Sequence, residues 1–385
     1  MFHSYFTTFI ITRKAIMKRV ILGVLGLLAF GQSLMLSQGK FGGYMVGDYY
    51  YNVTRDQNFT SLANTQPSAA MPGATAMQAF QFRRIYFTYD NDISETFTTR
   101  FRLEVDQASN ASNGKIGVFV KDAYLRWKNI FSGSDLFFGI QPPPAYEVSE
   151  AAWSFRSLDK TQMDLRGVVA SRDFGLSLRG KITGDGMVNY WVMIGNNSGN
   201  SPATPVAGTA STKYKRYYGH IEVKPIANLH ATVYADFKDA ADIIDAATGN
   251  KVSNGTLTTA VFAGYGEPFK YNINAELFMT SQSNGYKPTG GTLGSKNGLG
   301  YSLFGTYYVL PELGVVARYD RFDPNTDGSS VGDVRNYILA GLSWKVDKNV
   351  QIMPNLLYET YELPAGVSNI DPSITARVTL YYIFL

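Results

Sequence analysis

The chain of 385 residues is rich in Tyr, Phe and Gly and contains no Cys. Its formal net charge of +4 arises before residue 39, where Arg13, Lys14, Lys18 and Arg19 stand with no acidic residue among them. Without those four, 31 of the 35 basic residues remain against 31 acidic ones. This balance argues against a nucleic-acid-binding protein, which needs a basic face to neutralise phosphates. No long apolar run follows the first forty positions, which argues against a helical membrane protein.

The amino terminus has the pattern of an export signal. Lys18 and Arg19 form a charged n-region, an apolar core follows over residues 20–30, and Gly31-Gln32-Ser33 has the small-x-small form of a cleavage site. A transmembrane anchor is the alternative, but the apolar core is shorter than the roughly 20 residues that span a bilayer. The pattern therefore predicts secretion across a membrane.

The same pattern divides the chain into two parts. We predict a signal peptide over residues 1–38, of which residues 1–16 are an upstream extension. We predict that the mature chain begins between positions 34 and 40, and that residues 39–385 form one β-barrel domain.

After the signal, segments that alternate in polarity are separated by turn residues, which is typical of barrel strands. Sixteen such segments are predicted, near residues 40–53, 78–90, 94–107, 118–129, 134–141, 167–182, 187–196, 213–224, 228–239, 255–267, 270–281, 297–309, 312–323, 333–346, 350–361 and 371–385. The fold class is therefore all-β, a transmembrane antiparallel barrel of about 16 strands. Barrels of this size leave an aqueous channel, whereas eight-stranded barrels fill their interior with side chains.

The connections between these segments alternate between short and long. Pro268-Phe269 and Asp347-Lys348-Asn349 are examples of the short set, and residues 54–77 and 142–166 belong to the long and polar set. Short periplasmic turns and long extracellular loops are expected of an outer-membrane barrel. The even strand number places both termini at the periplasmic end.

Alternation within the strands indicates which side chains face the lumen. In segment 94–107, Phe97, Phe101 and Val105 share one face, and the opposite face is charged. A charge on the lipid face costs about 2–4 kcal/mol at mid-depth, so the charged face is expected to line the channel. The predicted pore-lining residues that could attract anions are Arg84, Arg100, Arg102, Arg126, Lys128, Arg179, Arg216 and Arg318. The alternative is that these cations pair across strands with inward acids such as Glu104, Asp122 and Asp320.

The connection over residues 142–166 is the third long one, and it is unusually rich in apolar residues for a surface loop. Trp153 and Phe155 would be costly in water but could pack against the inside of the barrel wall. We therefore predict an inward-folded third extracellular loop that narrows the channel; a lid above the membrane is the alternative. Its candidate constriction residues are Glu147, Glu150, Trp153, Phe155, Arg156, Asp159 and Lys160.

Several stretches resemble the phosphate-selective porin family of the porin O and P type. They are RRIYFTYDNDISETFTTRFRLEVD at 83–106, KDAYLRW at 121–127, DLFFGIQPPPAYEVSE at 135–150, SRDFGLSLRGKI at 171–182 and ARYDRFDPN at 317–325. The resemblance implies a homotrimer of sixteen-stranded barrels with inward-folded loops and a ladder of pore arginines. The closing segment, ARVTLYYIFL, has the alternating aromatic pattern that the barrel-assembly machinery of the outer membrane recognises.

The predicted function is therefore an outer-membrane porin, a water-filled channel for passive diffusion of small polar solutes and ions. A preference for inorganic anions, phosphate among them, follows from the resemblance. Outer-membrane lipid is the expected surroundings, and neither a cofactor nor a nucleic acid is expected. The alternatives are a non-conducting adhesive or structural barrel and an outer-membrane enzyme.

Two local patterns could belong to an enzyme or a metal site. His220 and His230 are the only histidines after the signal, and a pore-lining pair is favoured over a catalytic or metal site. The segment Asp323 to Gly328 mimics the start of a calcium loop, but Val334 stands where the bidentate Glu is required. A plain turn is the better interpretation, and no catalytic or metal-binding residue is predicted.

Overall fold

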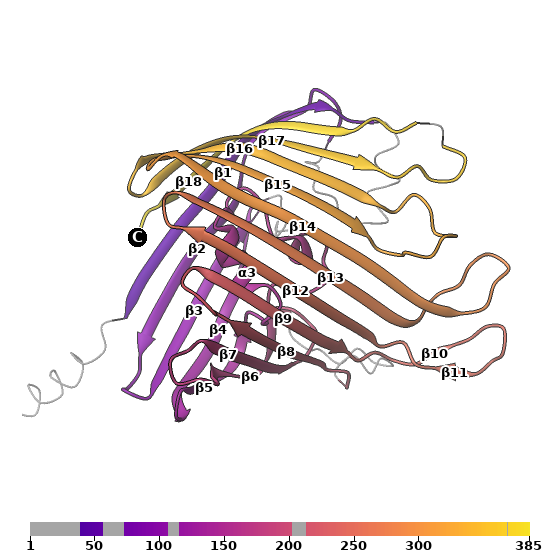
Figure 1. The fold of residues 1–385 in the computed structure, drawn as a ribbon, viewed down its shortest axis with the longest axis horizontal. Helices are drawn as coiled ribbons and strands as arrows, with labels where there is room; N and C mark the ends of the chain where they lie inside the picture. Colours follow the sequence, from indigo (N-terminus) through magenta and orange to yellow (C-terminus); the bar gives the residue numbers. More distant parts are fainter. Residues whose placement is uncertain (1–38, 57–72, 107–114, 202–212, 368) are drawn as a thin grey trace, which may run out of the picture.

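Sixteen antiparallel strands close into a barrel, in which the first strand pairs with the last. The computed structural model describes residues 39–56, 73–106, 115–201, 213–367 and 369–385. The predicted signal peptide, residues 1–38, lies outside the described residues. Each barrel strand pairs with its neighbours in the chain, so the sheet is a simple up-and-down meander (Figure 1).

The first half of the barrel is built from β1 (Lys40–Thr54), β2 (Gln78–Asp92), β3 (Phe97–Asp106), β4 (Gly117–Phe131), β5 (Ser134–Gln141), β6 (Asp173–Lys181), β7 (Val188–Gly195) and β8 (Arg216–Val223). The second half is built from β9 (Leu229–Lys238), β12 (Thr256–Glu267), β13 (Tyr271–Tyr286), β14 (Gly294–Leu310), β15 (Leu313–Asp323), β16 (Arg335–Asp347), β17 (Val350–Tyr361) and β18 (Ser373–Ile383). Two short helices, α3 (Glu147–Trp153) and α4 (Gln162–Leu165), lie between β5 and β6.

The predicted sixteen-stranded all-β barrel is confirmed, with three differences in detail. The sixth strand begins at Asp173 rather than at 167, because residues 167–172 complete the preceding loop. The predicted loop 240–254 contains a small hairpin of its own, β10 (Ile243–Ile244) paired with β11 (Lys251–Val252). β13 extends to Tyr286, five residues beyond its predicted end, because the strand continues past the barrel rim.

Short turns lie at one end of the barrel and long connections at the other (Figure 1). Residue 39, the first described, and the carboxyl terminus lie together at the short-turn end, since the backbone of Gly43 bonds with those of Phe384 and Leu385. This arrangement matches the predicted periplasmic end with tight turns and both termini.

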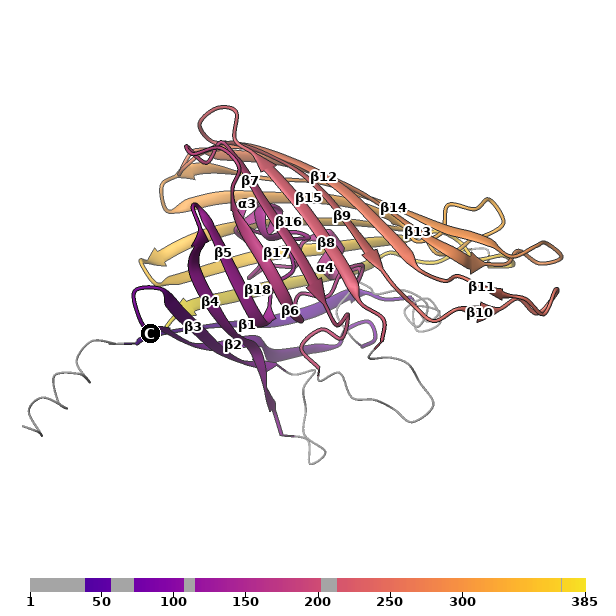
Figure 2. The ribbon, with the colours of Figure 1, turned by 90° about the horizontal axis from the view of Figure 1, so that it is seen from below.

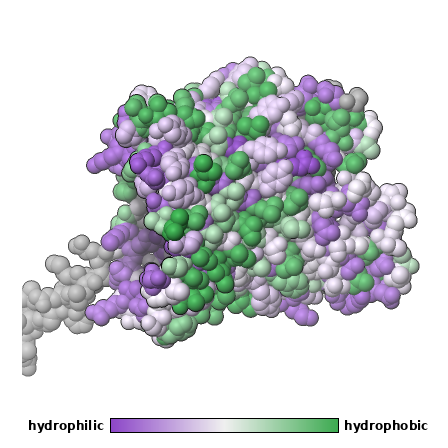
Figure 3. Space-filling view, viewed as in Figure 1, coloured by the Kyte–Doolittle hydropathy of each residue, from purple (hydrophilic) through white to green (hydrophobic). Residues whose placement is uncertain are grey.

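The outward face of the strands is apolar and the inward face is polar. In β9, Val233 is 63% exposed on the outside, whereas Tyr234 is 2% exposed on the inside. The same alternation gives β12 its strict pattern of exposed and buried residues. Apolar side chains gather over the middle of the outer face and hydrophilic ones toward its ends (Figure 3). Among the described residues, no helix is long and apolar enough to cross a membrane.

A β-bulge breaks the alternation in β2. Val46 of β1 pairs with Arg84, but the next residue, Gly47, pairs with Phe82, so Arg83 has no partner in the ladder. An extra residue of this kind lets two successive side chains point to the same face. Arg83 contacts Asp48 and Arg84 contacts Glu104, both inside the barrel.

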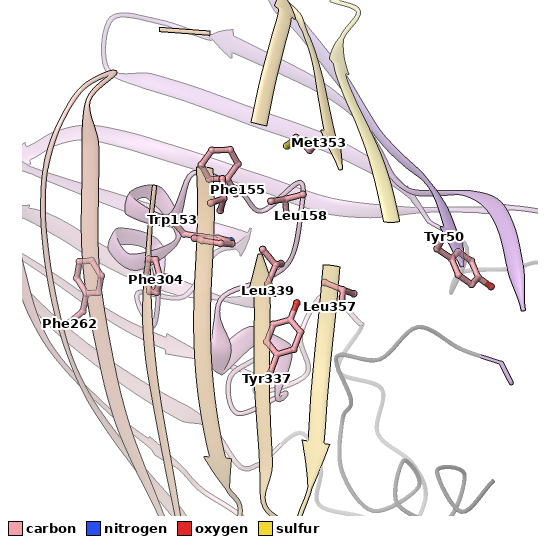
Figure 4. Close-up of a cluster of buried hydrophobic side chains, with 11 residues drawn as sticks. Tyr50, Trp153, Phe155, Leu158, Phe262, Phe304, Tyr337, Leu339, Met353 and Leu357 are labelled. Carbon is pink, nitrogen blue, oxygen red and sulfur yellow. The ribbon is translucent and has the colours of Figure 1, made fainter. Parts of the chain in front are cut away.

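The interior is occupied by one long connection, residues 142–172, which we call the inner loop (Figure 2). Trp153, Phe155 and Leu158 are at most 3% exposed and pack against the wall formed by β14–β17 (Figure 4). A second apolar cluster joins Tyr146, Met163 and Val169 to the walls of β7–β9, β12, β13 and β15. Trp153 and Phe155 therefore lie against the barrel wall, as predicted from their cost in water.

An arginine placed on the outer wall tests whether that wall faces lipid. We expect Val233→Arg to lower the free energy of unfolding by about 2–4 kcal/mol, because Val233 lies at the middle of β9 on the exposed apolar face. The measurement is denaturant unfolding of the barrel in lipid vesicles, with Val233→Leu as the apolar control. Equal stability of the two variants would show that this wall is not in contact with the hydrocarbon core.

Candidate functional site

Wall arginines hold the tip of the inner loop by its backbone. Arg83 Nη1 and Arg377 Nη2 both donate to the carbonyl oxygen of Leu158, at 2.8 Å and 2.6 Å. Arg84 Nη1 donates to the carbonyl of Arg156 at 2.9 Å, and Arg318 donates to that of Lys160. Guanidinium groups suit this role because they keep their charge and present several donors in a fixed plane.

Side-chain hydrogen bonds and an ion pair also hold the inner loop in place. Trp153 Nε1 donates to the carbonyl of Asp159 at 2.8 Å, and Tyr337 Oη donates to the Asp159 carboxylate at 2.8 Å. Further along, Gln162 Nε2 donates to the carbonyl of Arg321 at 2.7 Å, and Arg166 pairs with Glu359 at 2.8 Å. These bonds give buried polar groups of the loop partners on the wall or within the loop.

The inner loop also carries an ion network of its own. Arg156 pairs with Glu150 at 2.6 Å and with Asp164 at 2.9 Å, and Lys160 pairs with Asp164 at 3.5 Å. Glu147, at the start of α3, faces Arg179 of β6 at 3.6 Å. All seven predicted constriction residues therefore lie inside the barrel. Trp153, Phe155 and Asp159 hold the loop in place by buried contacts and do not face the channel.

Two carboxylates of the loop are held in the ionised form. Burial raises the pKa of Asp159, but the guanidinium groups of Arg318, Arg377 and Arg83 outweigh it, so the pKa lies below its ordinary value. Burial of Asp164 is likewise outweighed, by Arg156 and Lys160. A carboxylate whose pKa is lower in the folded state stabilises the fold at a pH above its unfolded pKa of about 3.9. This stabilisation is lost as the pH falls through the pKa of the folded state. The loop contacts of these carboxylates should therefore persist in mildly acidic solution.

Five cations meet on the inner face of β2–β4 and the adjoining loop: Arg84, Arg102, Lys121, Arg156 and Arg172, which we call the basic cluster. Glu104 is shared by Lys121 at 2.8 Å and Arg84 at 3.8 Å. Asp122 is shared by Arg102 at 3.3 Å and Arg172. Arg156 reaches the cluster through the Tyr86 hydroxyl, at 3.3 Å. Each wall carboxylate is shared by two cations. With Glu150 and Asp164, the partners of Arg156, the five cations face four carboxylates, so positive charge exceeds negative charge here.

The eight predicted pore cations fall into two groups. Arg84, Arg216 and Arg318 are at most 8% exposed and bind the inner loop; Arg216, for example, donates to the carbonyl of Val168. Those that keep a more exposed side chain are Arg100, Arg102, Arg126, Lys128 and Arg179.

All eight cations have a carboxylate within ion-pair distance. Six of these carboxylates lie on another strand, whereas Glu147 lies on α3 and Asp320 lies on the same strand as Arg318. The pairs are Arg84–Glu104, Arg100–Asp90, Arg102–Asp122, Arg126–Asp135, Lys128–Asp92, Arg179–Glu147, Arg216–Asp236 and Arg318–Asp320. A ladder of unpaired arginines is therefore not what these eight residues form.

Sequence reasoning missed two residues that the site depends on. Strict alternation places Arg83 on the lipid face of β2, and only the bulge turns it inward. Arg172 falls in the predicted sixth strand, in the outward phase relative to Arg179, but it belongs to the end of the inner loop. The two arginines were themselves a usable signal of a local change of phase, since a charged side chain is costly at a position that alternation assigns to the lipid face.

The two histidines lie on neighbouring strands, β8 and β9. His230 Nδ1 lies 2.8 Å from Glu222 Oε1. His220 and His230 both line a cavity between α3 and the wall of β5–β9. Within the described ranges, no group of three or more His, Asp or Glu side chains could hold a metal ion. In the calcium-like segment, Asp323, Asn325 and Asp327 each accept a backbone N–H two residues on, which makes successive Asx turns.

Comparisons with known proteins place the fold. No family model and no curated protein sequence matches the chain. The anion-selective porin from Comamonas acidovorans matches with 13% identity, 90% of this chain and 100% of that chain covered, and a TM-score of 0.60. The outer membrane channel DcaP of Acinetobacter baumannii matches with 11% identity, 90% and 97% covered, and a TM-score of 0.63. OprB of Pseudomonas putida matches with 12% identity, 90% and 94% covered, and a TM-score of 0.59.

At these identities the likeness establishes the fold alone. The chain is a porin-like barrel of the outer-membrane type, with sixteen strands. The resemblance to phosphate-selective porins gains no support from a family model.

The arginine contacts predict how firmly the inner loop is held. We expect Arg83→Gln combined with Asp48→Asn to loosen the loop, because it removes two hydrogen bonds to the loop carbonyls together with the carboxylate that pairs with Arg83. A spin label on Ala151→Cys, in a chain without other Cys, should become more mobile. Asp48→Asn alone is the matched control and should leave the label as in the parent. Identical spectra for the double and single variants would show that Arg83 does not hold the loop.

Proposed function

We propose that the protein is an outer-membrane porin that admits small polar solutes and ions by passive diffusion and favours anions. The observation that carries this proposal is the basic cluster beside the inner loop. Selectivity in a pore comes from charges of one sign at a narrow point, and here cations outnumber the wall carboxylates that they share.

The architecture supports the proposal in two further ways. The outer wall is apolar around the barrel, so it suits a lipid surrounding. The inner loop is held to the wall by charged hydrogen bonds, so its side chains keep a constant position in the lumen. In this proposal Arg100, Arg102, Arg126, Lys128 and Arg179 line the path, and Glu147, Glu150, Arg156 and Lys160 face it from the loop.

An adhesive or structural barrel is the second candidate. The observation that favours it is the extent of apolar packing inside, since two apolar clusters join the inner loop to the wall. A barrel whose lumen is filled by such packing need not conduct. An enzyme has less support, because among the described residues neither a metal cluster nor a catalytic pair involving His220 is present.

Export, assembly and oligomeric state complete the proposal. We propose that residues 1–38 direct export, that the barrel-assembly machinery recognises the closing strand β18, and that three copies associate in the membrane. The outer membrane protein OmpT of Vibrio cholerae, whose fold is similar with a TM-score of 0.55, is described in a trimer form. Phosphate specificity is not part of the proposal, because each of the eight predicted cations already has a carboxylate partner.

Single-channel recording of the purified protein in a planar bilayer tests conduction. We expect stepwise openings, and a reversal potential of the sign for anion preference under a KCl gradient. Folding is checked independently by the shift in electrophoretic mobility on heating. Folded protein without conductance would contradict the porin proposal and favour the structural barrel.

Charge reversal tests the selectivity. We expect Arg100→Glu with Arg102→Glu to move the reversal potential toward cation preference, because it replaces two exposed lumen cations by anions. Lys251→Glu with Lys348→Glu is the control of equal charge change, since Lys251 lies in the outer hairpin and Lys348 in a turn at the opposite end. An equal shift in both double variants would show that the overall charge, and not this wall, sets the selectivity.

A further inference from the structure

Arg179 differs from the other inward arginines in what holds it. Its guanidinium carbon lies 3.9 Å from the ring centre of Phe137 and 4.7 Å from that of Trp191. These rings come from β5 and β7, the strands on either side of β6. Aromatic faces attract a guanidinium by cation–π interaction and stacking, and they leave its N–H edge unoccupied.

The N–H donors of Arg179 have few hydrogen-bond acceptors near them. Its ion pair with Glu147 is 3.6 Å long, and within the described residues it donates no hydrogen bond. By contrast, Arg100, Arg126 and Arg216 each place two nitrogens on a carboxylate, at 2.6–3.0 Å. The Arg179 side chain is also 32% exposed. It is therefore a fixed and accessible donor group with spare capacity.

A cavity of about 580 Å³ opens beside Arg179, between α3 and the wall of β5–β9. Val148, Ala151 and Ala152 of α3 form an apolar side, and Trp191 lies opposite. The cavity also includes Lys181, two positions after Arg179 in β6, which has no ion-pair partner among the described residues. Besides Glu147, its lining holds two carboxylates that already have partners: Asp135 pairs with Arg126, and Glu222 with His230. Its volume is within the range of small-molecule sites, which combine apolar walls with a few placed polar groups.

We propose that this cavity binds a small organic carboxylate with a compact apolar body. The free edge of the Arg179 guanidinium donates two parallel hydrogen bonds to the carboxylate, in the planar geometry that suits both groups. The apolar side chains of α3 and the Trp191 ring cover the body. An inorganic anion would leave this apolar side unused, and Glu147 disfavours a second negative charge on the ligand.

Glu147 competes with the ligand for Arg179. Its carboxylate is the present ion-pair partner, and a bound carboxylate must take its place or share the guanidinium with it. Removing the charge of Glu147 should therefore strengthen binding, whereas removing that of Arg179 should weaken it. Opposite effects of two neighbouring substitutions are not expected from a merely structural role of either residue.

The idea that solutes bind at this site while they cross the channel rests on the proposed porin function. The binding of a carboxylate to the cavity does not depend on it. The test is therefore titration calorimetry on the purified full chain in detergent, with benzoate as the probe. Benzyl alcohol has the same ring without the charge, and inorganic phosphate has the charge without the ring. We expect benzoate to bind at least about tenfold more tightly than benzyl alcohol, because hydrogen bonds to charged groups contribute about that factor or more. We expect it to bind more tightly than phosphate also, because phosphate has no ring for the apolar side to cover.

Variants identify the residues. We expect Arg179→Gln to raise the benzoate Kd about tenfold or more, and Arg179→Lys to raise it also, because the planar fork is lost. Glu147→Gln should lower the Kd. Lys238→Gln removes one cation at the far end of β9 and should leave the Kd within about twofold, as a control for overall charge. Heat-dependent electrophoretic mobility confirms that each variant is folded.

The outcomes separate this inference from the porin proposal. Equal binding of benzoate and benzyl alcohol, or an equal effect of Arg179→Gln and Lys238→Gln, overturns the site. Benzoate binding without single-channel current keeps the site and contradicts the porin. Current that benzoate does not reduce, together with no calorimetric binding, keeps the porin and overturns the site.

Discussion

Charged hydrogen bonds from the wall to the inner loop are the interaction on which the rest of this structure depends. Arg83, Arg84, Arg318 and Arg377 donate to carbonyl groups of residues 156–160 and so hold the loop tip across the lumen. A loop crossing a barrel exposes backbone groups that must find partners. The arginines supply them, with several donors held in a fixed plane.

The apolar half of the interior follows from this anchoring. Once residues 156–160 are held, Trp153 and Phe155 lie against β14–β17 and leave water. Two cavities lie along β2–β9, beside the exposed cations and Arg179, and another lies between α3 and the wall of β12–β14. The wall arginines therefore divide into those that position the loop and those that a solute can reach, although all have the same inward phase.

Much of this could be predicted from the sequence. The strand number, the alternation of short and long connections, the inward face of β3 and the buried position of Trp153 follow from local polarity, because lipid and water select opposite faces at a period of two. The site was harder. The bulge at Arg83 and the late start of β6 shift the phase locally, and the one sign of the shift in the sequence is an arginine at an outward position.

The sequence by itself determined that this chain forms a large outer-membrane-type barrel with charged residues inside and a third loop too apolar for a surface. Only the tertiary structure decided which arginines are used up by the loop and which keep free donors, as Arg179 does. The physical reason is that facing the lumen depends on local backbone periodicity. A charge's partners depend on which strands and which part of the inner loop come within about 4 Å of it, and that is set by the closure of the whole barrel.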